Sequence, residues 1–331
     1  MELGRKLFGC GLVLLLAAPA MGHHGVASLG AAGLEGPGAP VETTVSANLP
    51  KGSVLSYLKL DYAQFKKKTA ARDAESDYNS FWMYGLGYGI KPYLTGYVFL
   101  PYYNKVVEDN SYNTSGFADI SLTGVLGFKY DDGFRLVPAG ESLDDLEDLH
   151  FTSILGMTVP SGHVNEADSS GTPDPGMALG FGTPSFLAGF SASKMRGRHT
   201  LNFDTSYIGF YEYKYADDNK VKFGDEYRVN LAYVNRLYVS VPKKLRLDGI
   251  LEANYLNLGR DRLNGTGELA TGGRMLYLQP GVRVYKNNVS TAVGVKLPTA
   301  TWLNEEGDQQ GAEGVENYRL IFSFSVMLGG S

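Results

Sequence analysis

Apolar and polar residues alternate along most of the chain beyond residue 53, which is the pattern of β-strands that present two different faces. In the stretch 118–130, for example, Leu122 and Phe128 fall on one face while Ser121 and Lys129 fall on the other. The chain is therefore expected to be all-β. The alternation predicts twelve strands, at residues 54–65, 80–90, 92–103, 118–130, 149–159, 185–195, 199–211, 225–237, 245–258, 274–285, 289–297 and 317–328.

The connections between the predicted strands alternate in length. Long loops on one side and tight turns on the other are typical of transmembrane β-barrels, and the charged residues here fall on the less apolar face, as a polar lumen requires. A soluble sandwich also alternates, but Tyr and Trp near the strand ends favour a transmembrane antiparallel barrel of about twelve strands in residues 54–331, with both termini in the periplasm. The long, polar connections are 66–79, 104–117, 160–184, 212–224, 259–273 and 298–316.

One connection departs from this rule. Residues 131–148 lie on the short-turn side, yet they form a long stretch that contains an acidic run from Glu141 to Asp148. Either this is a long periplasmic loop, or the barrel has fourteen strands. The run lacks the glycine turn and ligand spacing of an EF-hand loop, so we interpret it as a solvated loop in preference to a calcium site.

The first 22 residues predict a secretory signal peptide. Arg5 and Lys6 precede an apolar run at 7–18, and small residues follow it. The single cysteine, Cys10, leaves with this signal, so no disulfide is expected in the mature protein. No later apolar run reaches the length of a membrane-spanning helix.

Residues 23–53 are rich in Gly, Ala and Pro and show no strand periodicity. They form either a plug that threads into the barrel lumen or a periplasmic tail. We favour the plug, because Leu34 and Val45 are more apolar than a linker requires. His23 and His24 stand near the expected mature N-terminus and are weak candidates for binding copper or nickel, although adjacent histidines also occur without metal.

Composition narrows the function. Hydrophobic residues make up 44% of the 331 residues and the net charge is −5, which excludes a disordered chain and gives no support for nucleic-acid binding. The sequence contains no nucleotide motif, so no cofactor is expected and transport across an outer membrane would be passive.

Two groups of residues are candidates for the lumen and a substrate path. The aromatic group lies on the third predicted strand and suits either an apolar solute or the packing of a plug. The charged group falls on the strand faces that are expected to point into the lumen. Cross-strand pairing is its expected role, and a polar path for an anion is the alternative. The candidates are Tyr93, Tyr97, Phe99, Arg228, Arg246, Glu252, Arg283 and Arg319.

An enzymatic alternative is a lipid hydrolase with a Ser–His pair at the membrane rim. His150, His163 and His199 are available, and Ser153 has lipid-facing parity. However, the chain has no Gly-x-Ser-x-Gly elbow, and only spatial adjacency could define such a pair. We therefore expect no catalytic site.

Several segments, taken in order, resemble the outer-membrane proteins associated with the phenol meta-cleavage degradation pathway. The segments are GFADISLTGVLGFKY at 116–130, MTVPSG at 157–162, GFGTPSFLAGFSASK at 180–194, FGDEYRVNLAYVNRL at 223–237 and LYLQPGVRVYKNNVSTAVGVKLPTA at 276–300. The resemblance covers residues 80–331 and implies a membrane barrel in the neighbourhood of hydrocarbon and fatty-acid channels, without catalytic residues.

Together with the export signal and the aromatic third strand, this resemblance predicts a channel for passive uptake of small hydrophobic or aromatic compounds. Its expected partners are outer-membrane lipid, the hydrophobic solute and the barrel-assembly machinery. A structural or general-porin barrel without a specific ligand is the alternative.

Overall fold

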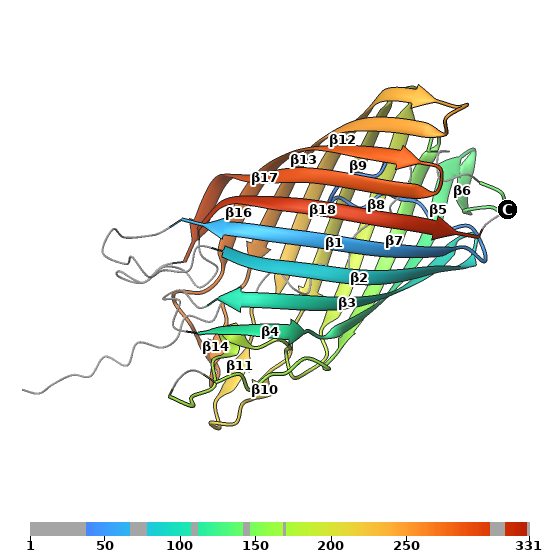
Figure 1. The fold of residues 1–331 in the computed structure, drawn as a ribbon. Coiled ribbons are helices and arrows are strands. Elements are labelled where there is room, and N and C mark those ends of the chain that lie inside the picture. Colours follow the sequence, from blue (N-terminus) through green and yellow to red (C-terminus); the bar gives the residue numbers. More distant parts are fainter. Residues whose placement is uncertain are drawn as a thin grey trace, which may run out of the picture.

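A computed structural model describes residues 38–66, 78–106, 112–141, 146–167, 170–304 and 315–329. In these residues twelve long strands form an antiparallel sheet that closes on itself as a barrel (Figure 1). Consecutive long strands pair with each other, and the last pairs with the first. The predicted all-β barrel and its strand number are confirmed. The long strands are β1 (Val54–Phe65), β2 (Tyr78–Lys91), β3 (Leu94–Val106), β5 (Ile120–Asp131), β7 (Leu149–Val159), β8 (Phe186–Arg196), β9 (His199–Gly209), β12 (Glu226–Ser240), β13 (Leu245–Leu258), β16 (Gly273–Lys286), β17 (Val289–Leu303) and β18 (Glu316–Leu328).

Short elements lie at the two ends of the barrel. β4 (Asn113–Phe117) pairs with the end of β3, and β6 (Gly133–Leu136) folds back on the end of β5. A separate small sheet lies in the long loops, at the end of the barrel opposite the C-terminus (Figure 1). Its strands are β10 (Tyr213–Lys214), β11 (Lys220–Lys222), β14 (Arg262–Leu263) and β15 (Thr266–Gly267), and a 3-10 turn covers Pro175–Met177. None of the described residues belongs to a helix that is long and apolar enough to cross a membrane.

The described residues of the connection 131–148 form no further strand of the barrel wall, so the twelve-strand count is right. β6 makes only a local hairpin with β5. Beyond it Val137 and Leu146 are buried, and the amide of Met195 on β8 donates to the carbonyl of Leu146 (2.6 Å). The loop therefore folds back onto the barrel at its short-turn end. Asp144 and Asp145 of the acidic run lie outside the described residues.

β17 is longer than the alternation predicts. The predicted strand stops at residue 297, because Pro298 has no N–H group to donate to the ladder. In the structure the strand continues to Leu303, and its pairing with β16 shifts register between Leu276 and Tyr277, where Pro298 lies opposite. Because the register shifts at this point, the strand continues past Pro298 although the proline donates no hydrogen bond to the ladder.

The outer face of the barrel is apolar. Aromatic pairs mark both of its ends: Tyr62 stacks on Tyr78 near the long loops, and Tyr130 contacts Phe134 near the short turns. A closed barrel with an apolar band and aromatic ends is what a bilayer requires. Every long strand contributes an exposed hydrophobic side chain, for example Leu60, Trp82, Val98, Leu122, Leu155, Phe186, Leu201, Tyr227, Leu251, Leu276, Val293 and Leu320.

A groove of about 700 Å³ lies in the outer face across β2, β3, β5 and β7. Its floor is the directly paired Gly96 and Gly124, which have no side chains to fill the space between Tyr88 on one side and Leu155 on the other. The groove is therefore an apolar surface that faces away from the lumen.

Candidate functional site

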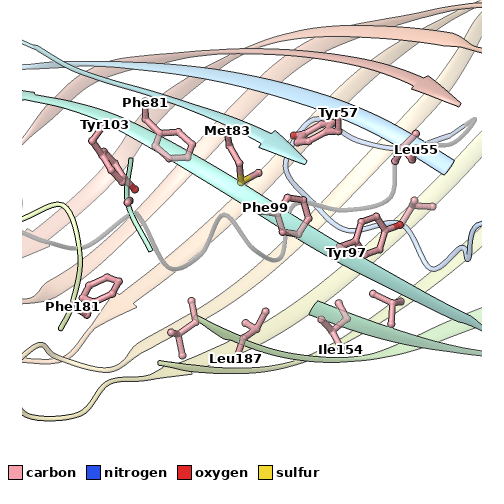
Figure 2. Packing of buried hydrophobic residues seen from close by; sticks show 14 of the residues in the cluster. Leu55, Tyr57, Phe81, Met83, Tyr97, Phe99, Tyr103, Ile154, Phe181 and Leu187 are labelled. Carbon is pink, nitrogen blue, oxygen red and sulfur yellow. The ribbon is translucent and has the colours of Figure 1, made fainter. Parts of the chain in front are cut away.

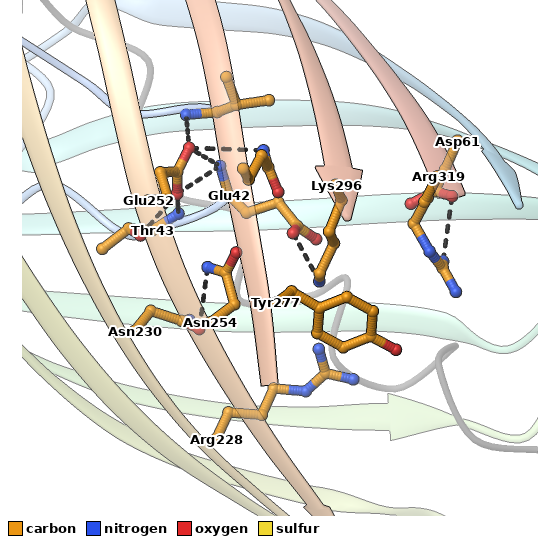
Figure 3. Close-up of polar contacts among 12 residues, drawn as sticks. Glu42, Thr43, Asp61, Arg228, Asn230, Glu252, Asn254, Tyr277, Lys296 and Arg319 are labelled. Atoms are coloured by element: carbon orange, nitrogen blue, oxygen red, sulfur yellow. Dashed lines mark hydrogen bonds and ion pairs between the residues drawn. The ribbon is translucent and has the colours of Figure 1, made fainter. Parts of the chain in front are cut away.

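The described residues that precede β1 include a stretch that lies inside the barrel. We call residues 38–49 the lumen segment; all of its residues except Glu42 are buried. The backbone amides of Val41, Glu42 and Thr43 donate to the carboxylate of Glu252 on β13 at 2.6–3.2 Å, and the Thr43 hydroxyl adds a contact of 2.6 Å (Figure 3). Three successive amides around one carboxylate form an anion-binding nest.

The lumen segment crosses the whole lumen. The amide of Thr44 donates to Asp204 on β9 (2.6 Å), and the amide of Leu49 donates to the hydroxyl of Thr95 on β3 (3.0 Å). β3 and β13, which holds the other end of the segment through Glu252, are six strands apart in either direction around the barrel. The segment therefore connects opposite walls.

Tyr97 and Phe99 form a flat aromatic surface on the inner wall. Their rings are stacked with centroids 5.7 Å apart, and they lie across Gly87 and Gly85 of the neighbouring strand β2. A Cβ at Gly85 would stand 2.7 Å from the Phe99 ring and one at Gly87 would stand 2.5 Å from the Tyr97 ring, so both positions require glycine. Leu49 of the lumen segment reaches the same place, within 3.0 Å of a Cβ at Gly87.

Tyr93 does not belong to this surface. The predicted strand at 92–103 begins at Leu94, so Tyr93 lies in the tight turn between β2 and β3. There its carbonyl accepts a hydrogen bond from the amide of Gly127 (2.8 Å).

Aromatic contacts continue the apolar inner wall toward the long loops. Phe81 lies 4.8 Å from Tyr103 between ring centroids, and Phe181 contacts both Phe210 (4.7 Å) and Phe223 (5.5 Å). Figure 2 shows Phe81, Tyr97, Phe99, Tyr103 and Phe181 together, and they belong to one buried cluster. The aromatic side chains therefore form one buried apolar cluster that extends from Tyr97 on β3 to Phe223 in the long loops.

Charged side chains also pair within the barrel wall, in the long-loop halves of β1, β12 and β18. Arg319 on β18 contacts Asp61 on β1 at 3.0 Å (Figure 3). Arg319 also pairs with Glu316, and Arg228 contacts Glu226 at 2.9 Å. The pair of Arg319 with Asp61 joins neighbouring strands, as predicted. Arg228 instead pairs along its own strand.

Part of the predicted cross-strand pairing is made by the lumen segment instead. Glu42 contacts Lys59 on β1 (3.5 Å) and Lys296 on β17 (2.7 Å). One carboxylate of the segment therefore neutralises lysines from two strands of the wall.

Arg246 and Arg283 lie nearer the short turns. Arg246 pairs with Asp248 along β13 (2.7 Å). Arg283 on β16 donates to the hydroxyl of Ser290 (3.0 Å) and to the carbonyl of Pro40 (2.5 Å), so it also holds the lumen segment.

The structure thus brings seven of the eight candidate residues into the lumen wall and leaves Tyr93 in a turn. His23 and His24 lie outside the described residues. Within the described ranges, no group of three His, Cys, Asp or Glu side chains could hold a metal ion.

Asp119 joins three segments at the long-loop end. It falls within the strand predicted at 118–130, but in the structure it lies between β4 and β5. Its carboxylate accepts from the amides of Ser161 (3.0 Å), Gly162 (2.9 Å) and Phe181 (2.8 Å). Burial raises the pKa of Asp119 above its usual value, and the three amide donors partly oppose this shift.

The residues of the Asp119 contacts lie in three of the segments that carry the resemblance described above. GFADISLTGVLGFKY contains Asp119, MTVPSG contains Ser161 and Gly162, and GFGTPSFLAGFSASK contains Phe181. Each segment contains a strand, and the structure brings together the residues at the long-loop ends of these three strands. Gly180 is also constrained, because a Cβ there would lie 2.5 Å from the Asp119 carboxylate.

The histidines considered for catalysis have other partners. His150 contacts Glu141 (3.1 Å), which also pairs with Lys129 and so ties the loop before β7 to β5. His163 contacts Glu166 (2.9 Å), and His199 contacts the hydroxyl of Tyr233 (2.6 Å). None of these contacts among the described residues is a Ser–His pair.

Replacing Glu252 by Gln is expected to loosen the lumen segment. A carboxamide has one acceptor oxygen, and its NH₂ group would face amide donors, so at least one donor loses its partner at a cost of about 1–3 kcal/mol. Single-channel recordings should show more frequent openings than the parent. The matched control is Glu147→Gln, because Glu147 is exposed in a loop. If E252Q and E147Q open equally often, Glu252 does not anchor the segment.

Comparison with known proteins identifies the fold. No protein-family model and no curated protein matches this chain. The structure is similar to an outer membrane channel from Pseudomonas putida F1, with a TM-score of 0.66 and 13% identity over 86% of this chain and 98% of that one. This likeness shows an outer-membrane type of barrel and does not extend to a substrate.

Two further solved barrels are more distant. The Pseudomonas putida toluene transporter TodX has a TM-score of 0.38 and 10% identity, over 89% of this chain and 98% of that one. The beta domain of the Bordetella autotransporter BrkA has a TM-score of 0.42 and 9% identity, over 84% of this chain and all (100%) of that one. Scores this low carry no functional argument.

Proposed function

We propose that this protein is an outer-membrane channel for the passive uptake of small hydrophobic or aromatic compounds. The observation that carries the proposal is the apolar inner wall, a single buried cluster that includes Leu49 and Leu55 near the short turns and Phe223 in the long loops. An apolar solute gains nothing from a water-filled pore, so it needs continuous apolar surface along its path.

The surroundings of the barrel support this proposal. The apolar outer band fits a bilayer, and the expected signal peptide fits export. The short turns then lie in the periplasm. The start of β1 and the end of β18 lie on the same side, since Val54 pairs with Leu328. Outer-membrane lipid and the barrel-assembly machinery are the proposed partners. The resemblance to proteins of phenol degradation favours an aromatic solute.

The lumen segment is proposed to act as a plug. It crosses between opposite walls, and Leu49 packs where the Tyr97 ring lies across Gly87. Tyr97 and Phe99 are both buried in this arrangement. A solute reaches them only when the segment moves, and the closed arrangement keeps bulk water away from the path.

Uptake by a deletion strain tests the proposal. Cells that lack the protein should take up aromatic hydrocarbons or fatty acids more slowly than the parent, and the full-length chain should restore the rate. Parental uptake of every compound by the deletion strain would contradict a transport role.

Replacing Tyr97 and Phe99 together by Ala is expected to slow uptake several-fold without unfolding the barrel, because the path loses its aromatic surface. The measurement is the initial uptake rate in the complemented deletion strain, with heat-modifiable migration on gels as the check of folding. The control is Tyr130→Ala, which removes an exposed aromatic ring from the outer face. Equal uptake rates in the two variants would show that Tyr97 and Phe99 do not line the path.

A further inference from the structure

Three neighbouring turns of the barrel carry exposed cations and no acidic residue. They lie at the short-turn end, where the C-terminus lies (Figure 1), and they join β8 to β9, β12 to β13 and β16 to β17, which are adjacent pairs in the sheet. The stretches 192–203, 236–247 and 282–290 contain no Asp or Glu, whereas the connection 131–148 at the same end is acidic. This end of the barrel therefore has a basic arc. Its exposed cations are Lys194, Arg196, Arg198, Lys243, Lys244 and Lys286.

Hydrogen bonds hold two of these turns together. The ammonium group of Lys286 donates to the carbonyl of Lys243 (2.6 Å), and the amide of Asn287 donates to the carbonyl of Lys244 (3.0 Å). We call Lys243, Lys244 and Lys286 the basic cluster. Among the described residues none of the three has an acidic partner. Because like charges on touching turns repel each other, a bound anion would stabilise the arrangement.

An apolar surface adjoins the basic cluster on the outer face of the barrel. Tyr238, Leu247 and Val284 pair directly across β12, β13 and β16, so they point the same way and form an outward row. The next outward row toward the turns holds Lys286, which lies two residues beyond Val284 on β16. In the β12–β13 turn itself, Val241 is 80% exposed. A surface that is apolar on one side and cationic on the other fits the boundary between the hydrocarbon and the headgroups of a bilayer.

We propose that the basic cluster binds the phosphate groups of anionic phospholipids, while Val241 and the adjoining outward row contact their acyl chains. The inference concerns how the barrel is held in its membrane and does not depend on the solute that the barrel carries. Lys binds phosphate as a point charge, and cations near an anionic lipid surface are attracted to it. A zwitterionic headgroup brings a cation of its own, so it relieves less of the repulsion among the three lysines. An acidic protein would complement the lysines but would leave the apolar row without a partner.

A fluorescent reporter beside the basic cluster shows which lipid lies there. The full chain with V241W is reconstituted into phosphatidylcholine liposomes that contain increasing fractions of brominated phosphatidylglycerol or of brominated phosphatidylcholine, because bromine quenches indole fluorescence on contact. The exposed position of Val241 makes this substitution compatible with the fold. The parent chain supplies the background signal of Trp82 and Trp302, and heat-modifiable migration on gels checks that each variant has folded.

Two charge variants are compared in the V241W chain. K243Q/K244Q/K286Q removes the basic cluster. The matched control K214Q/K220Q/K222Q removes three lysines from the long loops, where Lys214, Lys220 and Lys222 pair with carboxylates. Both variants change the net charge by the same amount, so a difference between them reports the place of the lysines and not their number.

Brominated phosphatidylglycerol is expected to quench the V241W signal at a roughly fivefold lower fraction than brominated phosphatidylcholine, the factor that a single lysine near an anionic surface provides. High salt should weaken this preference. K243Q/K244Q/K286Q should abolish it, and K214Q/K220Q/K222Q should retain it. Equal quenching by the two lipids, or an unchanged preference without the basic cluster, overturns the proposal and leaves an acidic protein as the partner of this surface. Quenching of Trp82 in the parent by brominated phosphatidylcholine tests membrane insertion separately, because Trp82 is exposed on the outer face of β2. If this quenching is absent, the proposed channel function fails as well.

Discussion

Deleting residues 26–48 is expected to raise the single-channel conductance of the barrel several-fold. The described part of this deletion is the lumen segment without Leu49, which crosses from β13 to β3 through Glu252 and Thr95. A twelve-stranded barrel encloses a wider lumen than an eight-stranded one, whose interior is filled by its own side chains. Removing the segment therefore leaves a continuous path for ions, and conductance in planar lipid bilayers measures it.

A peptide added back to the shortened barrel separates plugging from general damage. A peptide of residues 38–48 retains Glu42 and the amides that bind Glu252, so it should lower the conductance again. A peptide of the same composition in scrambled order should not. Heat-modifiable migration of the shortened chain shows whether the barrel has assembled. Conductance equal to that of the full chain would mean that the lumen segment does not close the path.

Much of the barrel could be predicted because the alternation of apolar and polar residues within each strand marks the strand and its two faces. The bounds at 54–65, 149–159 and 245–258 agree with β1, β7 and β13. Alternation also fixes which residues share a face, so Arg228 and Glu252 were assigned to the lumen. It cannot decide which face of β3 points inward when both are apolar; the structure shows that Tyr97 and Phe99 do.

The contacts between the lumen segment and the barrel wall could not be predicted in the same way. Glu252 binds amides more than 200 positions away in the chain, at Val41 and Thr43. No local period encodes that partner, because the segment has no regular secondary structure of its own. Pro298 shows the opposite failure: a reliable local signal for the end of a strand was overridden by a register shift in the neighbouring strand.

Replacing Asp119 by Ala is expected to release the loop at 160–184 while the barrel stays closed. The carboxylate accepts from the amides of Ser161, Gly162 and Phe181; Phe181 is buried, and a buried donor that loses its partner costs about 1–3 kcal/mol. A second anchor of the same loop, Lys105, donates to the carbonyls of Gly176 and Ala178, so the loop should open locally without detaching completely. Limited proteolysis of the folded protein in detergent, with the cut sites mapped, measures the opening.

Asp217→Ala is the matched control for this variant. Asp217 is exposed in another long loop, where it accepts hydrogen bonds from its near neighbour Asn219. Its loss should leave cleavage within 160–184 at the parental rate, whereas D119A should accelerate it at least tenfold, the factor that about 1.4 kcal/mol provides. Because Phe181 also contacts Phe210 and Phe223, the same variant should loosen the aromatic end of the proposed path. Equal cleavage in D119A and D217A would show that the aromatic packing alone holds this loop, and that Asp119 does not.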